Sequence, residues 1–282
     1  MSTEMNKVKT TPAGTSSPSG SQTLLRGLDV LEAVVAGSIG LGELATKLGL
    51  TRSTTHRLAS ALVDRRYLSF VPREGYSLGA KLLELGYGAR QQMDIPRIAR
   101  PYLEALAEAS DNTVHLGVLD DWRALYLDKI AGQRRIEISS RVGERQPLTT
   151  TGLGKALLLD ESETRWQELW QNEAGEKGST LKWEQWLKRM RNYAQKGHAF
   201  DLEENEDRIR CVAAPIREAG GHIVAAISVS GAAQYMSDAH MAELTVTVKN
   251  ASAAISEQFG WQESAVTEEA HAEIAGDRKR RI

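Results

Sequence analysis

The sequence contains little of what a secreted, membrane-spanning or metal-dependent protein requires. Its one cysteine, Cys211, cannot form an internal disulfide or complete a multi-cysteine zinc site, and its six histidines never occur with HxxxH spacing. No apolar run approaches the roughly 18 residues that span a membrane. Lys7 and Lys9 near the start are not followed by an apolar stretch, as they would be in a secretory signal. These absences predict a cytoplasmic protein without a metal or a cofactor.

The charged residues are divided unevenly along the chain. The net charge is −2, but residues 1–90 contain 11 Lys and Arg against 7 Asp and Glu, which leaves 24 against 30 in the remainder. A basic front part is typical of a domain that faces a polyanion, and the acidic rear part indicates a different role. A chain of 282 residues has room for two such domains.

Composition and periodicity divide the chain into five segments. Residues 1–21 are rich in Ser, Thr, Gly and Pro and are expected to form a disordered arm, and residues 262–282 a charged tail. Residues 22–79 combine three helical patterns with two β-type runs, and residues 80–94 continue as a linker helix. Residues 95–261 interleave helical and strand patterns around one sheet. The predicted fold class is therefore α+β, with a small module of three helices and a hairpin joined by the linker helix to an α/β sensor-like domain.

The third helical pattern carries polar side chains along one face. Thr51 is a predicted N-cap, because its hydroxyl can accept a hydrogen bond from an amide of the first turn. Ser53, His56, Arg57 and Ser60 then recur at intervals of one, three or four residues. Taken alone, this pattern is more typical of a solvated amphipathic helix. The β-hairpin predicted directly after it changes the interpretation to a winged helix-turn-helix, which reads the major groove of DNA.

The predicted DNA-binding residues are the polar ones of that helix and one arginine of the wing. Arginine can bridge a guanine edge, while hydroxyl groups and helix N-terminal amides bind phosphates. Arg73 lies in the turn of the hairpin, where it either contacts the DNA backbone or is an ordinary surface charge. The predicted set is Arg52, Ser53, Thr54, Thr55, His56, Arg57, Ser60 and Arg73.

In the rear domain, strands are expected at 113–119, 124–130, 136–141, 211–216 and 222–230, with a closing helix at 238–259. A glycine turn, GLGK at 152–155, precedes another helix. It is not a nucleotide-binding P-loop, because Thr149 replaces the first required glycine and Ala156 follows the lysine. Its amides either hold a small carboxylate or only begin a helix.

Several ordered motifs resemble one family. LRGLDVLE at 25–32, GLTRSTTHRL at 49–58 and YSLG at 76–79 resemble the winged helix-turn-helix of the IclR family of bacterial transcription regulators. PLTTTGLGKALL at 147–158 and RCVAAPI at 210–216, followed by AAISVSG at 225–231, resemble the GAF-like effector-binding domain of the same family. The resemblance covers residues 21–261. It implies a cytoplasmic regulator, expected to be a repressor, that binds double-stranded operator DNA as a homodimer or homotetramer and responds to a small organic acid.

The resemblance also implies which residues bind the effector. In this family the pocket is built by the glycine turn, an acidic stretch, the cysteine and the serines of a late strand. The matching residues here are Gly152, Leu153, Asp201, Cys211, Ser228 and Ser230. One departure is Arg208, which stands where family members usually have glycine, so the loop geometry beside the pocket and a role for Arg208 toward an acidic ligand are open questions.

Two further motifs bear on the class of effector, and two rival functions stay open. TVHLGVLD at 113–120 and SRVGERQPL at 140–148 resemble the branch of the family that regulates sugar-acid catabolism, including the 2-keto-3-deoxygluconate regulators. A sugar acid or keto acid is therefore the expected effector. The rival functions are an enzyme with Cys211 as nucleophile and His198 or His222 as base, and a small-molecule-binding adaptor without DNA contact.

Overall fold

The computed structural model describes residues 22–134, 138–173 and 181–262. The chain separates into two compact units, residues 1–93 and 94–282. The predicted arm at 1–21 and nearly all of the predicted tail at 262–282 lie outside the described residues. Among the helices that are described, none is long and apolar enough to cross a membrane.

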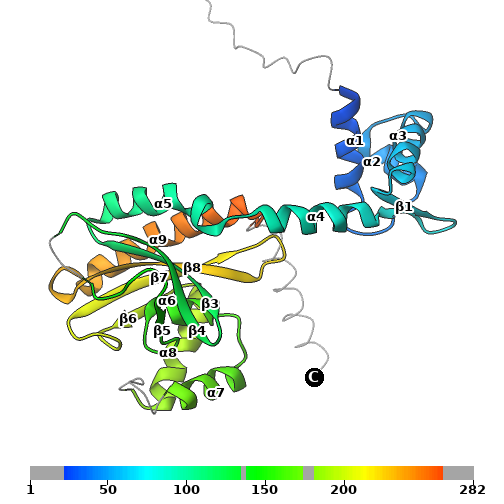
Figure 1. Cartoon of the computed structure of the whole chain (residues 1–282). Coiled ribbons are helices and arrows are strands. Elements are labelled where there is room, and N and C mark those ends of the chain that lie inside the picture. Colours follow the sequence, from blue (N-terminus) through cyan, green and yellow to red (C-terminus); the bar gives the residue numbers. More distant parts are fainter. Residues whose placement is uncertain (1–21, 135–137, 174–180, 263–282) are drawn as a thin grey trace, which may run out of the picture. The chain divides into compact units, whose positions relative to one another are not determined.

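The first unit is a winged helix-turn-helix followed by one more helix (Figure 1). Its core is formed by apolar side chains from all three leading helices and from the hairpin, among them Val30, Leu44, Leu58 and Tyr76. The elements are α1 (Gln22–Ala33), α2 (Leu41–Leu48), α3 (Arg52–Asp64), β1 (Leu68–Val71), β2 (Gly75–Leu78) and α4 (Ala80–Gln92).

Local sequence signals explain the turn between α2 and α3 and the position of the wing, the hairpin of β1 and β2, beside Ile39. Gly49 ends α2 in the left-handed region, with φ of 63°, and Thr51 caps α3 by accepting a hydrogen bond from the Thr54 amide. The wing strand β2 pairs with β1 and also forms a bridge from Tyr76 to Ile39. Glycine is required at position 75, because its φ is 100° and because a Cβ on it would lie 2.2 Å from the Ile39 carbonyl oxygen.

The second unit is a six-stranded antiparallel sheet with helices on both faces (Figure 1). The strand order is β5-β4-β3-β8-β7-β6. Helices α5 and α9 cover one face, and α6, α7 and α8 cover the other (Figure 1). The strands are β3 (Thr113–Asp120), β4 (Arg123–Ile130), β5 (Arg145–Gln146), β6 (Ala199–Leu202), β7 (Ile209–Arg217) and β8 (Ile223–Ala232). The helices are α5 (Ile95–Ser110), α6 (Gly152–Leu157), α7 (Glu163–Glu173), α8 (Trp183–Lys196) and α9 (Asp238–Gln258).

Strand alternation assigns each face of the sheet its own chemistry. Val212 of β7 and Val229 of β8 point into the core under α5 and α9. Cys211 of β7 lies on the opposite face, in the core under α6. Because Ser228 and Ser230 alternate with Val229, they share that second face. The polar side chains of the central strands therefore gather under α6, where the candidate cavity lies.

Two details of the predicted sheet were wrong. The strand expected at 136–141 begins outside the described residues, and Ile138–Arg141 form no strand. Two short strands, β5 and β6, were not predicted. Both lie at the edges of the sheet and contain two and four residues, which is too short for an alternation pattern to stand out in the sequence.

Candidate DNA-binding helix and effector cavity

The exposed side of α3 carries most of the residues that the sequence assigned to DNA. Arg52, Ser53, His56 and Arg57 are exposed, and Thr54 and Ser60 are half-buried. On the opposite side of the helix, Leu58 and Ala59 are buried in the core of the unit. The helix therefore presents an unobstructed polar and basic surface of the kind that a recognition helix inserts into the major groove.

Thr55 corrects the predicted set. Its side chain is fully buried, and its hydroxyl donates a hydrogen bond of 3.0 Å to the Thr51 carbonyl. A threonine in this position stabilises the first turn of α3 and cannot contact DNA. The prediction included Thr55 because it stands between Ser53 and His56 in the sequence, whereas its spacing from Leu58 and Ala59 places it on the core side.

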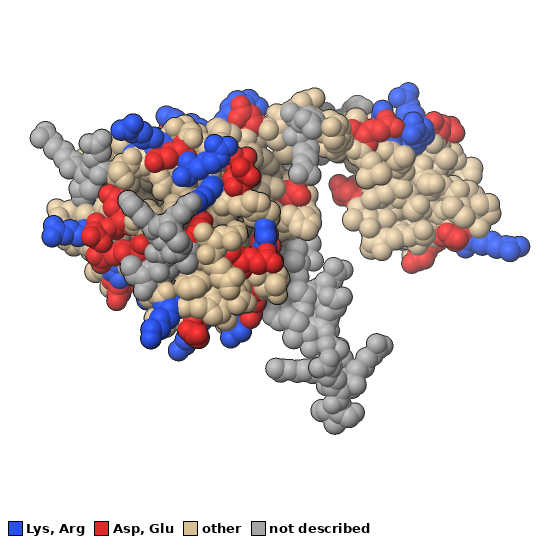
Figure 2. Space-filling model, turned by 60° about the horizontal axis from the view of Figure 1, so that its bottom comes forward, with Lys and Arg blue, Asp and Glu red and all other residues tan. Residues whose placement is uncertain are grey.

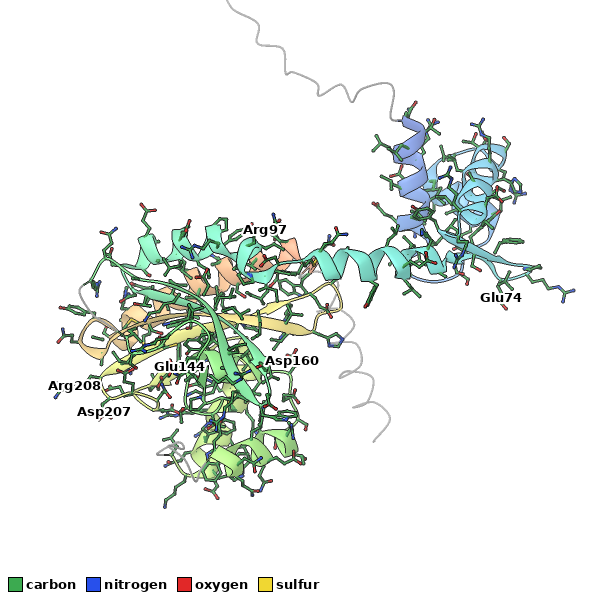
Figure 3. All side chains as sticks on the ribbon, in the orientation of Figure 1. Glu74, Arg97, Glu144, Asp160, Asp207 and Arg208 are labelled. Carbon is green, nitrogen blue, oxygen red and sulfur yellow. The ribbon has the colours of Figure 1, made fainter. Side chains whose placement is uncertain are left out.

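Arg73 lies at the turn of the wing. It is exposed and adopts φ of 75°, in the left-handed region, between β1 and β2. Glu74 is labelled at the same hairpin end in Figure 3. The neighbouring Glu74 partly offsets the positive charge of Arg73, whose contact with the DNA backbone stays a prediction.

A small polar cavity lies on the α6 face of the sheet in the second unit. Its volume is about 40 Å³. Four of the six predicted effector residues line it, namely Gly152, Asp201, Cys211 and Ser230. The other lining residues are His115, Tyr126, Ile138, Ser139, Ser140, Gln146, Thr151, Asn205, Glu206 and Ile209. The family resemblance thus identified one side of the cavity, and the fold supplies the rest.

The two predicted residues outside the lining are Leu153 and Ser228. Leu153 is fully buried in the apolar core beneath α6, and its methyl groups pack against Gly117 of β3. Ser228 is 1 % exposed and pairs with His115 of β3 in the sheet register. Both residues lie behind the cavity wall, so direct contact of their side chains with a ligand requires that wall to move.

His115 is the main residue of the cavity that the sequence analysis missed. Its Nε2 lies 2.7 Å from the Ser140 hydroxyl, and its ring lies 5.0 Å from the ring of Tyr126. Burial, together with the nearby Lys129 ammonium, lowers the pKa of His115 to about 3, so the imidazole is neutral. The sequence contained a signal for His115, because it is a single histidine inside an otherwise apolar strand. Its position in the cavity depends on the pairing of β3 with β8, which the sequence does not give.

Asp201 provides the acidic group of the cavity. Its Oδ1 accepts hydrogen bonds from the amides of Glu204, at 2.8 Å, and Asn205, at 3.4 Å. Burial raises the pKa of Asp201 to about 6, against the opposing effect of the Lys155 ammonium. A carboxyl group with this pKa can act as an acceptor when ionised and as a donor when protonated.

The glycine turn fits closely over the cysteine. A Cβ on Gly152 would lie 2.7 Å from the Cys211 sulfur, and a Cβ on Gly154 would lie 2.5 Å from Leu148 Cα. Thr151 caps α6, because its hydroxyl accepts a hydrogen bond from the Gly154 amide. Among the described residues, no backbone carbonyl accepts a hydrogen bond from the amides of Gly152 and Leu153.

The segment before the turn is fixed by a buried carboxylate from α7. Glu173 accepts hydrogen bonds of 2.8 Å from the amides of Leu148 and Thr149 and one of 2.5 Å from the Thr149 hydroxyl. The indole of Trp186 on α8 donates to the Thr149 carbonyl at 2.8 Å. Helices α7 and α8 therefore determine where the glycine turn lies over the sheet.

Arg208 is at the surface and does not line the cavity. It adopts φ of 63°, the left-handed conformation that glycine adopts without strain, and its carbonyl accepts a hydrogen bond from the Ala233 amide. Figure 3 shows Arg208 and Asp207 together at the end of their loop. The loop therefore keeps a glycine-type backbone, and Arg208 gives the cavity no cation.

Cys211 is unsuited to nucleophilic catalysis. It is 5 % exposed, and burial raises the pKa of its thiol to about 11, so the thiolate is scarce at neutral pH. Neither candidate base, His198 or His222, lines the cavity that contains Cys211, and the His198 ring contacts the Lys196 carbonyl. The arrangement is that of a ligand-binding wall.

A polar helix in a winged helix-turn-helix and a polar cavity in a sheet domain define a ligand-responsive DNA-binding regulator. Comparison with known families identifies which one. Residues 23–72 match the IclR helix-turn-helix domain, and residues 88–257 match the domain described as bacterial transcriptional regulator IclR C-terminal. The chain belongs to the IclR family of DNA-binding transcription regulators.

Relatives and solved structures agree with this assignment. The acetate operon repressor of Salmonella typhimurium is 32% identical over 88% of this chain and 94% of its own length. The regulator KdgR of Dickeya chrysanthemi is 30% identical over 87% of this chain and 82% of its own. The crystal structure of Pseudomonas aeruginosa HmgR superposes with a TM-score of 0.73 at 21% identity, covering 86% of this chain and 99% of that one. The relatives are regulators, and the families that match are not enzymes.

Proposed function

We propose that this protein is a repressor of a catabolic operon and that a small organic acid, with a sugar acid or related keto acid as the leading class, controls its DNA affinity. The observation that carries the proposal is the convergence of Gly152, Asp201, Cys211 and Ser230 on one polar cavity. Relatives whose names describe repressors support the direction of control. Resemblance to KdgR proteins supports the sugar-acid class. Since the target is operator DNA, the compartment in which the protein acts is the cytoplasm.

The lining favours a ligand rich in oxygen. Asp201, Ser230 and the Asn205 amide group can each form further hydrogen bonds with hydroxyl or keto groups, which an apolar ligand does not offer. The amides at the start of α6 are donors for a carboxylate, without a cation in the lining. A hydroxylated acid therefore satisfies more of the wall than an aliphatic or aromatic acid.

The cavity must widen to admit such an acid. Its volume of about 40 Å³ is well below the ~300 Å³ or more that ligand pockets usually measure. Effector binding therefore selects a conformation in which the surrounding loops have moved. An effector that binds this widened conformation more tightly than the closed one can change the affinity of the protein for DNA. A tenfold to hundredfold change in DNA affinity needs a difference of only about 1.4 to 2.8 kcal/mol between the effector's binding free energies for the two conformations.

Self-association completes the DNA-binding site. One winged domain reads only a few base pairs, so useful specificity needs two copies on half-sites about 34 Å apart or a multiple of that distance. The first unit exposes apolar side chains on α1 and α4, including Leu24 at 65 %, Leu83 at 78 % and Tyr87 at 67 %. In Figure 2 the visible face of this unit has a broad area without charged side chains. The exposed apolar side chains of α1 and α4 are the proposed contacts of a homodimer, which can pair again into a homotetramer.

The deciding experiment is electrophoretic retardation of the intergenic DNA beside the gene for this protein, titrated with sugar acids, keto acids and aromatic acids. We expect specific retardation that a sugar or keto acid changes at least tenfold. Calorimetry with Ser230→Ala should show weaker binding of that acid, and Ser228→Ala serves as the matched control, because it is the same change one step behind the cavity wall. Unmoved DNA, or equal loss in both variants, contradicts the proposal.

A further inference from the structure

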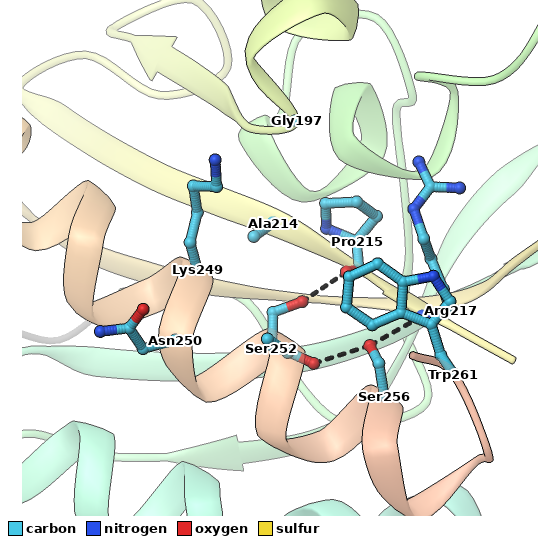
Figure 4. Close-up of a pocket in the computed structure, with 10 residues that line it drawn as sticks. Gly197, Ala214, Pro215, Arg217, Lys249, Asn250, Ser252, Ser256 and Trp261 are labelled. Atoms are coloured by element: carbon cyan, nitrogen blue, oxygen red, sulfur yellow. Dashed lines mark hydrogen bonds between the residues drawn. The ribbon is translucent and has the colours of Figure 1, made fainter. Parts of the chain in front are cut away.

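A second and larger cavity lies in the effector-binding unit, between α9 and the exposed edge of β7. Its volume is about 240 Å³, six times that of the effector cavity. It shares no lining residue with that cavity. Figure 4 shows its lining residues, which are Gly197, Ala214, Pro215, Arg217, Lys249, Asn250, Ser252, Ala253, Ser256 and Trp261.

The cavity exists because the edge strand β6 is shorter than its neighbour. Pairing between β6 and β7 ends at Ala199 and Ala213, so β7 continues past the end of β6. Two serines of α9 form hydrogen bonds with backbone groups of β7 at this unpaired edge. Ser252 donates to the Pro215 carbonyl, and Ser256 accepts from the Arg217 amide at 2.9 Å (Figure 4). Because side chains replace a strand here, open space remains between the helix and the sheet edge.

The electrostatic character of the cavity is positive. Among the residues that the structure describes, its lining includes Arg217 and Lys249 and no Asp or Glu. The guanidinium of Arg217 is already occupied, because it donates to both carboxylate oxygens of Asp160, at 2.6 and 2.8 Å. Lys249 differs, since its ammonium donates to the Lys196 carbonyl at 3.0 Å and forms no ion pair with any carboxylate in the described ranges. An ammonium has three donors, so Lys249 retains hydrogen bonds for a ligand.

A neighbouring histidine responds to the same positive charge. His198 follows Gly197 of the lining. Burial lowers the pKa of His198, and the ammonium groups of Lys249 and Lys196 lower it further, against the Lys196 carbonyl that contacts its ring. The contribution of the two ammonium groups, unlike that of burial, also favours an anion placed near them.

The remaining wall is apolar and partly flat. The indole of Trp261 lies beside Pro215 and Arg217 in Figure 4, and Ala214 and Ala253 complete the surface. An aromatic ring, a proline ring and two methyl groups offer a place for the body of a ligand, while Lys249 offers a polar contact (Figure 4). Cavities with apolar walls and a few convergent polar groups are typical of small-molecule sites.

We propose that this cavity is a second ligand site, which binds a small organic acid with a planar or compact apolar body. The carboxylate contacts Lys249, and the body lies against Trp261 and Pro215. This ligand class differs from the oxygen-rich acid of the effector cavity, which has no basic side chain other than His115 in its lining. The site is independent of the proposed effector site, so either can fail without the other.

The test uses sodium benzoate as the probe and benzamide as its neutral counterpart, in calorimetric titrations of the full chain up to about 10 mM, where a millimolar site is largely filled. We expect benzoate to bind and benzamide not to bind. Lys249→Gln should weaken benzoate at least tenfold by removing a charge-assisted hydrogen bond. Trp261→Phe should weaken it less, and the tryptophan fluorescence change that we expect benzoate to cause in the wild type should be reduced or lost.

Two control variants distinguish this site from a nonspecific effect of charge and from the effector cavity. Lys188→Gln makes the same change of charge on α8, outside the lining, and should bind benzoate like wild type. Asp201→Asn alters the effector cavity and should leave benzoate binding unchanged. The proposal is overturned if wild type binds no benzoate, if Lys249→Gln binds it as tightly as wild type, or if Asp201→Asn alone abolishes binding.

Discussion

Ser139 donates a hydrogen bond of 2.9 Å to the carboxylate of Glu206, and this contact joins two loops that line the effector cavity. One loop follows β4 and the other joins β6 to β7. The first loop is also held from below, because the Lys129 ammonium donates to the carbonyls of Ile138 and Ser140. Since the cavity must widen to admit an acid, the Ser139–Glu206 hydrogen bond is a contact that opening breaks, whereas the Lys129 contacts can persist.

Ser139→Ala is therefore predicted to make effector binding faster and tighter. Removing a hydrogen bond to a charged acceptor should lower the free energy of opening the cavity by about 1 to 3 kcal/mol. This corresponds to an increase in the association rate of the effector of a few-fold to about a hundredfold. Stopped-flow mixing with the effector checks this. Ser139 is exposed, so stability should change little. An unchanged or lower association rate contradicts the role of this contact.

Asp201 predicts that binding of an acid depends on pH. The pKa of Asp201 is raised to about 6 in the free protein, chiefly by burial, and an anion placed in the cavity raises it further. The bound state therefore holds more protons than the free state above pH 6. Affinity should fall as pH rises from about 6, by up to about tenfold per pH unit, until the pKa of the bound state is passed.

Calorimetry in buffers with different ionisation enthalpies measures this proton uptake directly. Asp201→Asn is the matched variant, because the amide oxygen can still accept the hydrogen bonds from Glu204 and Asn205. The variant should bind the acid with no proton uptake from this position. Equal pH dependence in wild type and variant would show that another group accepts the proton.

The buried ion pair beneath the cavity predicts an asymmetry in stability. Lys155 Nζ lies 2.9 Å from Glu204 Oε2, and the two side chains are 1 % and 3 % exposed. Arg189 pairs with the other oxygen of Glu204 at 2.7 Å. Glu204→Gln leaves the Lys155 ammonium buried without its partner and should cost about 3 to 5 kcal/mol of unfolding free energy. Lys155→Met leaves Glu204 paired with Arg189, so it should cost less.

Urea unfolding of the two single variants and of Lys155→Met/Glu204→Gln checks the order. The double variant removes both buried charges, so its loss should be smaller than the sum of the two single losses. If Lys155→Met proves the more damaging change, or if the two losses add, the pair is not the interaction that stabilises this part of the unit.

Local signals in the sequence predicted most of the helices and strands, but they could not predict contacts that depend on how distant segments pack together. Thr51 at the start of α3 and Gly49 before it are local signals, and both act in the structure as caps. Period-two alternation placed Ser228 and Ser230 on one face of β8. Which serine reaches the cavity depends on the register with β3, where His115 lies opposite Ser228, and no local pattern contains that information.

The same limit explains the rest of the candidate site. Ser140 reaches His115 from a loop 25 positions away, and Glu206 reaches Ser139 from 67 positions away. Neither contact follows from helix or strand periodicity. The family resemblance identified the turn, the acid and the cysteine, because those matches depend on particular residues in order. It could not supply the residues that complete the wall from other loops.

DNA recognition by α3 gives the last prediction. Arg57 is exposed on the polar side of α3, and Arg52 is exposed in its first turn. Arg57→Ala and Arg52→Ala should each weaken specific operator binding by about 1 to 3 kcal/mol, which is roughly fivefold to 150-fold, while the unfolding free energy stays within about 0.5 kcal/mol of wild type. Thr55→Val is the contrasting change on the buried side of the same helix. It removes the hydrogen bond to Thr51 and should lower stability by about 1 kcal/mol without altering the DNA affinity of the folded protein. Retardation assays at fixed salt, with a scrambled duplex as competitor, measure the change in DNA affinity, and urea unfolding measures the change in stability. Operator affinity that survives in both arginine variants, or is lost in folded Thr55→Val, would show that another surface of the winged unit reads the DNA.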